Sequence, residues 1–150
     1  MTALITPELV LLDLDSDDRT EVTRALAERL AAAGRVTDLA GFLADVQARE
    51  AQMPTGLPGG IGIPHARSAH VTVPTLGFAR VPKGVDWGAE DGPAKLIFLI
   101  AAPEGGGDDH LKILAALARR LMRTEFRESL MNAPDAAAVV DVVTREVVTP

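Results

Sequence analysis

A run of residues from Gly56 to Arg67, GLPGGIGIPHAR, constrains the fold more than any other part of the chain. It holds four glycines, two prolines and one of the chain's three histidines. Glycine and proline contribute little packing energy, and they act mainly by setting the path of the backbone. Ile61 and Ile63 alternate as in a short strand, and Pro64 then fixes φ and removes a backbone donor. The pattern predicts that His65 lies at the end of a short strand, at the rim of the protein.

The composition predicts one globular domain over residues 1–150, with residues 1–8 and 145–150 loosely ordered. The hydrophobic content of 47% is sufficient for a core, and the absence of cysteine excludes disulfides, thiolate chemistry and a Cys-based zinc site. A net charge of −6 disfavours nucleic acid or an anionic membrane as a partner. No apolar run approaches the ~20 residues of a membrane helix, and the N-terminus lacks a signal-peptide pattern. We therefore expect a cytoplasmic protein that does not insert into a membrane.

Apolar periodicity predicts helices that alternate with strands. Asp18 is the expected N-cap of a first helix that ends at Gly34, and a second helix starts near Thr37 or Asp38. The continuous apolar run from Leu96 to Ile100 predicts a central strand covered on both faces. A helix after the glycines at 105–107 is expected to bury Leu111, Leu114, Leu117, Ala118 and Leu121. These elements predict an α/β domain, a layered sheet with helices on both faces.

Arg49 continues the apolar stripe of the second helix, which runs through Leu39, Phe42, Leu43 and Val46. Two interpretations are open. Arg49 complements the helix dipole and buries only the stem of its side chain. Alternatively, its guanidinium points into the pocket formed by the loop that follows, where it is able to pair with phosphate.

His110 falls in the first turn of the helix that follows the triple glycine. Such a helix start presents free backbone N–H groups and the positive end of the dipole, and therefore attracts anions. Both His65 and His110 lie next to glycine-rich turns and apolar strands, so parallel neighbouring strands would bring them together. The alternative is that His110 is a tolerated surface residue, but the glycine clusters before each histidine favour a shared site.

These residues suit phosphoryl transfer, with His65 as the nucleophile. Imidazole is both a good nucleophile and largely unprotonated near neutral pH. A phosphoryl group in transfer carries charge on three oxygens, which positioned donors stabilise. Arg49, His110 and the N–H groups of residues 107–110 are the candidate donors. No metal or other cofactor is needed if the phosphoryl donor is itself an activated phosphohistidine.

Two other interpretations are weak. The glycine run matches neither G-x-G-x-x-G nor the lysine-containing P-loop, and no long helix follows it directly. The histidines at 65, 70 and 110 and the aspartates at 108 and 109 lack the helical spacing or cysteine support of a metal site. We therefore interpret His70 as a surface residue and expect no metal.

Several motifs in order resemble a known family. GIGIPHAR at 60–67, VPTLGFAR at 73–80, LIFLIAAPE at 96–104 and DDHLKIL at 108–114 are similar to the enzyme IIA domain of the fructose–mannitol class. That class belongs to the bacterial phosphoenolpyruvate-dependent sugar phosphotransferase system, and the motifs at 96–114 resemble its fructose branch. The resemblance runs from about Leu9 to Val143.

The resemblance implies a mixed β-sheet flanked by helices, and it implies specific roles. His65 would take a phosphoryl group on Nε2 from the phosphocarrier HPr and pass it to a cysteine of enzyme IIB, which phosphorylates the sugar at the membrane channel IIC. His110 and Arg49 match the supporting histidine and arginine of the family. Gly62 departs from the alanine of many relatives, which should change loop stiffness and leave the chemistry intact.

The resemblance leaves two functions open, sugar transport and regulation. Nitrogen-regulatory IIA relatives share the phosphohistidine but act by binding and regulating other proteins. The fructose-like motifs favour transport, and a phosphorylation-dependent regulator is the alternative. A non-catalytic ligand-binding α/β domain would instead stay unlabelled when mixed with phosphorylated HPr.

Overall fold

The computed structural model describes residues 3–52, 54–90, 92–105 and 109–148. The strands are β1 (Val10–Leu11), β2 (Gly56–Leu57), β3 (Ile61–Gly62), β4 (His65–Ser68), β5 (Thr75–Val85) and β6 (Ala94–Pro103). The helices are α1 (Arg19–Ala32), α2 (Leu39–Gln52), α3 (Asp109–Leu121), α4 (Thr124–Met131) and α5 (Ala136–Val143). A 3₁₀ turn, η1 (Pro7–Leu9), precedes β1, and a π-helical turn, η2 (Thr144–Val148), follows α5.

The strands form one mixed sheet in the order β1-β5-β6-β3-β2, with β4 also paired to β6. Strands β3 and β4 run parallel to β6, whereas β5 runs antiparallel to it. Strand β6 therefore lies inside the sheet, as its continuous apolar run predicts. Pro74 comes immediately before β5, so the proline marks a strand start, and β5 lies between β1 and β6.

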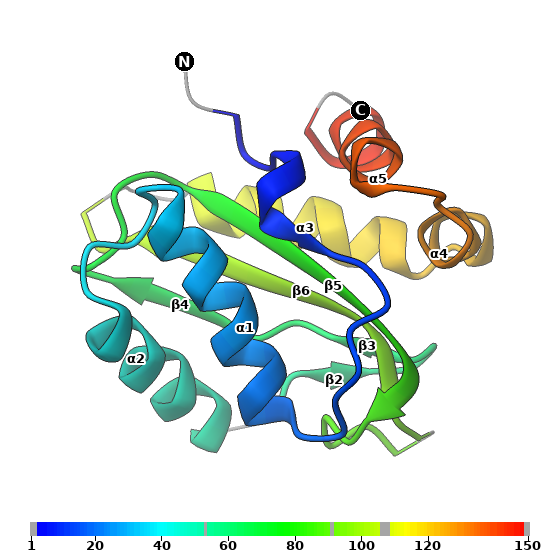
Figure 1. Cartoon of the computed structure of the whole chain (residues 1–150), viewed down its shortest axis with the longest axis horizontal. Helices are drawn as coiled ribbons and strands as arrows, with labels where there is room; N and C mark the ends of the chain where they lie inside the picture. Colours follow the sequence, from blue (N-terminus) through cyan, green and yellow to red (C-terminus); the bar gives the residue numbers. More distant parts are fainter. Residues whose placement is uncertain (1–2, 53, 91, 106–108, 149–150) are drawn as a thin grey trace.

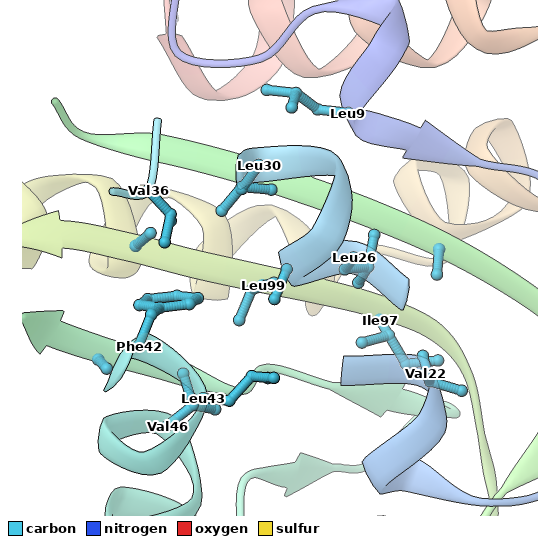
Figure 2. Close-up of a cluster of buried hydrophobic side chains, with 14 of the residues drawn as sticks. Leu9, Val22, Leu26, Leu30, Val36, Phe42, Leu43, Val46, Ile97 and Leu99 are labelled. Carbon is cyan, nitrogen blue, oxygen red and sulfur yellow. The ribbon is translucent and has the colours of Figure 1, made fainter. Parts of the chain in front are cut away.

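Helices cover both faces of this sheet. Figure 1 shows α1 and α2 in front of the strands and α3 behind them. Side chains of β6 alternate between the two faces: Ile97 and Leu99 belong to the cluster under α1 and α2, and Phe98 and Ile100 to the cluster under α3, α4 and α5. Figure 2 shows the first cluster, where Phe42, Leu43 and Val46 of α2 lie close to Leu99. The predicted α/β fold, a mixed sheet between two helical layers, is confirmed.

Local signals set the ends of α1. The carboxylate of Asp18, the N-cap, accepts a hydrogen bond of 2.8 Å from the backbone N–H of Thr20. The helix ends before Gly34, whose φ of +77° is in the left-handed region that favours glycine. Leu26 and Leu30 face the core from this helix and are fully buried. The second helix, α2, starts at Leu39 as predicted.

Three observations differ from, or add to, the expectations. Leu111 is expected to be buried but is 53% exposed, because it borders the cavity beside His65. Ile5 and Val147, which fall in the segments expected to be loosely ordered, are buried; residues 1–2 and 149–150 lie outside the described part. Among the described residues, no helix has both the length and the apolar character to cross a membrane.

Candidate active site

His65 is the first residue of β4, and it pairs in register with Ile100 of the parallel strand β6. Its side chain is half-buried. The ring nitrogen Nδ1 lies 2.8 Å from the carbonyl oxygen of Ile63. Because a carbonyl oxygen only accepts, this bond requires a proton on Nδ1. The neutral imidazole therefore keeps its lone pair on Nε2, which is the nitrogen available as a nucleophile.

The backbone around Ile63 is held from two directions. The carbonyl of Pro64 accepts a bond of 2.9 Å from the N–H of Ile100, and the N–H of Ile63 donates to the carbonyl of Thr55 at 3.1 Å. Pro64 has no N–H and cannot donate a backbone hydrogen bond. The strand pairing is therefore interrupted at Pro64, which separates β3 from β4. The sequence predicts His65 at the end of the short strand that contains Ile61. Instead, β3 ends at Gly62, and His65 begins the separate strand β4 after the proline.

A cavity of about 400 Å³ opens beside His65, between α2, β4 and the first turns of α3. Its lining includes His65, Arg49, Arg67, Asp45, Leu111 and Leu114. Cationic, acidic and apolar side chains from these elements thus line the cavity together with the imidazole. Such a lining suits an anionic group that is presented by a larger partner.

Arg49 reaches this cavity from the last turn of α2 and is half-buried. The helix is held against β4 by a hydrogen bond of 2.5 Å, in which the hydroxyl of Ser68 donates to the carboxylate of Asp45. The structure therefore brings Arg49 and His65 to one cavity. The lining of this cavity comes from α2, β4, β6 and α3, and not from the loop after α2 as the second interpretation of Arg49 expected.

Arg67 also lines the cavity, and sequence reasoning did not single it out. It follows His65 by two residues on β4, and side chains two apart on a strand face the same side. Its guanidinium donates a hydrogen bond of 2.9 Å to the carbonyl oxygen of Glu104, after β6. The period-two spacing from His65 was the available signal.

His110 is the second residue of α3, and its side chain lies outside the described part of the structure, as do Gly107 and Asp108. The next residue, Leu111, borders the cavity that contains His65. The third histidine, His70, lies elsewhere, with Nδ1 4.0 Å from a carboxylate oxygen of Asp38. Its half-exposed ring fits the expected surface role.

Comparison with known proteins identifies the family. Residues 3–146 match the family described as the phosphoenolpyruvate-dependent sugar phosphotransferase system, EIIA 2. The chain belongs to this enzyme IIA family. It is 43% identical over 141 residues to the "PTS system fructose-specific EIIA component" of Haloferax volcanii, an alignment that covers 93% of this chain and 92% of that protein.

Solved structures share the fold. The crystal structure of nitrogen regulatory protein IIA-Ntr from Neisseria meningitidis superposes with a TM-score of 0.86 at 30% identity, over 94% of this chain and 97% of that one. The complex of enzyme IIAMTL and phosphorylated enzyme IIBMTL from Escherichia coli matches with a TM-score of 0.80 at 24% identity, over 95% of this chain and 99% of that one. The second likeness, at its lower identity, concerns the fold alone.

As an enzyme IIA, the protein is a component of a phosphotransferase system that is phosphorylated on a histidine and transfers the phosphoryl group. The cavity beside His65 combines an imidazole with cationic groups. Its lining includes an imidazole whose Nδ1 is hydrogen-bonded to a carbonyl oxygen, and two arginines. Guanidinium groups match the geometry of phosphate oxygens and keep their charge at any working pH.

Proposed function

We propose that His65 is the histidine of this enzyme IIA that carries the phosphoryl group, on Nε2. The observation that supports this most directly is the bond from Nδ1 to the carbonyl of Ile63, since in the neutral ring this bond leaves the lone pair on Nε2, and His65 lines the cavity. His70 lies near Asp38 instead, outside the cavity lining.

The proposed step needs no additional base. The lone pair on Nε2 of His65 attacks phosphorus, the bond from phosphorus to the donor's imidazole nitrogen breaks, and its electron pair stays on that donor nitrogen. Positive charge then develops on the ring of His65. The carbonyl oxygen of Ile63 stabilises this charge, because a hydrogen bond to a charged donor is stronger than one to a neutral donor. The onward step reverses the sequence with a different acceptor.

Arg49 and Arg67 are the proposed cations for the phosphoryl oxygens. Both line the cavity, Arg49 from α2 and Arg67 from β4. His110 is proposed to add a hydrogen bond from the first turn of α3, where N–H groups and the helix dipole also favour an anion. Fixed donors around the transferred group supply most of the catalysis in phosphoryl transfer.

The proposed donor is phosphorylated HPr, and the proposed acceptor is the cysteine of enzyme IIB in the uptake of fructose through the membrane channel IIC. The 43% identity to a fructose-specific EIIA component supports the choice of sugar. The solved complex of an enzyme IIA of this fold with phosphorylated enzyme IIB supports the acceptor. All of these steps take place at the cytoplasmic side in this proposal.

A phosphorylation-dependent regulator is the second candidate, because the fold superposes on nitrogen regulatory protein IIA-Ntr at a TM-score of 0.86. One experiment separates the two. The ³²P-labelled protein is mixed with a fructose-type enzyme IIB and, in parallel, with that IIB after its cysteine is replaced by serine. Rapid loss of label to the cysteine form alone supports transport, and retention of label in both supports regulation.

A further inference from the structure

We propose that Glu50 is a positioning residue for the reacting imidazole, acting through Thr55 and Ile63. A continuous series of hydrogen bonds joins the carboxylate of Glu50 to Nδ1 of His65. The inference rests on the proposed role of His65. It states that Glu50, which lies outside the cavity lining, helps to keep the proton of the imidazole on Nδ1.

The series begins at the end of α2. Both carboxylate oxygens of Glu50 accept from Thr55: the backbone N–H donates at 2.7 Å and the hydroxyl at 2.6 Å. Thr55 is 6% exposed and the side chain of Glu50 is 16% exposed, so water has little access to replace these bonds. Two donors on one carboxylate fix both the position and the direction of Thr55.

The next two hydrogen bonds connect Thr55 to the imidazole through Ile63. The carbonyl of Thr55 accepts from the N–H of Ile63 at 3.1 Å, and the carbonyl of Ile63 accepts from Nδ1 of His65 at 2.8 Å. A displacement of Thr55 therefore moves the carbonyl that holds the ring. Because the bond at one ring nitrogen decides which nitrogen carries the proton, a lost contact at Nδ1 allows the proton to move to Nε2. That tautomer has no lone pair for attack on phosphorus.

A purely structural role for Glu50 predicts a different experimental outcome. Arg19, in the first turn of α1, lies 3.8 Å from the same carboxylate, so Glu50 also joins two helices. If this were its only function, removal would lower the stability of the fold and leave the imidazole tautomer unchanged. A measurement on the ring itself distinguishes the two.

The test uses the full chain, uniformly labelled with ¹⁵N, in four variants. Glu50→Ala removes the carboxylate, Thr55→Val removes only the hydroxyl bond, and Thr55→Ser retains both bonds. Glu28→Ala, an exposed acid on α1, is the control matched in charge. For each, long-range ¹H–¹⁵N spectra report the tautomer of His65, and rapid-quench assays with phosphorylated HPr report the rate constant of labelling. Thermal unfolding is recorded in parallel.

We expect the parent, Thr55→Ser and Glu28→Ala to show a proton on Nδ1 and equal rate constants. Thr55→Val and Glu50→Ala should shift population to the Nε2–H form and lower the rate constant, for Glu50→Ala by on the order of tenfold, the value of a hydrogen bond to a charged group. If Glu50→Ala does not fold, the tautomer and rate constant of Thr55→Val test the inference.

An unchanged ring spectrum in Thr55→Val and Glu50→Ala overturns the inference, even if both unfold at lower temperature. A different result overturns the assignment of His65 itself: the parent, with its ring correctly protonated on Nδ1, takes up no label at this residue. The two failures are therefore distinguishable.

Discussion

The indole ring of Trp87 occupies the space that a side chain at Gly62 would need. A Cβ at Gly62 would lie 2.7 Å from Cδ2 and 2.8 Å from Cγ of that ring, closer than real contacts allow. Trp87 is 1% exposed, so it has little room to retreat. Gly62 is a regular residue of strand β3, outside the left-handed region. The packing of Trp87 therefore leaves no room for a side chain at Gly62.

Gly62→Ala should therefore destabilise the fold by about 1–3 kcal/mol, the usual range for overpacking. Urea unfolding measures this change. Gly105→Ala is the matched control, because a Cβ at Gly105 meets no atom within 4 Å. In the double variant with Trp87→Leu the penalty at Gly62 should largely disappear, since contacting residues couple. An equal penalty in both backgrounds would contradict this account.

Arg80 is predicted to be essential for stability. Its Nη1 donates to the carbonyls of Leu130, Met131 and Ala133 at 3.0, 3.0 and 2.9 Å, while Nε pairs with Asp13 at 3.0 Å. The guanidinium thereby donates to backbone carbonyls at and just after the end of α4, and Arg80 is only 7% exposed. Arg80→Met should lower the free energy of unfolding by about 2–4 kcal/mol, because buried carbonyls lose their donor.

The control for Arg80→Met is Arg145→Met, at an exposed pair with Asp141. The free energy of unfolding of Arg145→Met is expected to differ from that of the parent by less than about 1 kcal/mol. Similar losses for both variants would show that the carbonyl bonds of Arg80 contribute little.

Arg49→Ala should slow phosphoryl transfer and leave the fold intact. By analogy with oxyanion-type donors, its loss raises the barrier by about 2–4 kcal/mol. Arg29→Ala is the control: Arg29 also lies in the last turn of its helix, α1, but its side chain is exposed and outside the cavity lining. Rapid-quench labelling by phosphorylated HPr measures both. A parental rate constant in Arg49→Ala would remove this residue from the mechanism.

His110→Ala is expected to have a similar effect on the rate, again about 2–4 kcal/mol in the barrier, because a donor to the phosphoryl oxygens is lost at the start of α3. His70→Ala provides the comparison, since His70 lies beside Asp38 and outside the cavity lining. Labelling rates and circular dichroism spectra are recorded for both. If the two histidine variants behave alike, His110 has no special role.

Much of this architecture could be predicted from the sequence because its signals are local. The unbroken apolar run of Leu96 to Ile100 indicates a strand covered on both faces, and β6 is such a strand. The stripe of α2 that ends at Arg49 follows from helical periodicity, and the cap at Asp18 follows from a carboxylate placed directly before a helical segment.

Other features depend on contacts between distant segments, which periodicity does not report. Leu111 fits the apolar stripe of α3 yet borders a cavity, since a stripe does not distinguish a core from a hollow at the sheet edge. Arg67 and its bond to Glu104 join residues on neighbouring strands of the sheet. The bonds that lead from Glu50 to the imidazole likewise become visible only when α2, β2 and β3 are placed in space.

The central claim is that Nε2 of His65 accepts the phosphoryl group, and intact mass with site mapping tests it directly. The protein is incubated with phosphoenolpyruvate, enzyme I and HPr, and its mass is compared with that of His65→Ala treated in the same way. We predict the addition of one phosphoryl group to the parent, mapped to the peptide that contains His65, and no addition to His65→Ala. Phosphorylation of His65→Ala to the same extent, or a label mapped to His70 or His110 in the parent, would contradict the account.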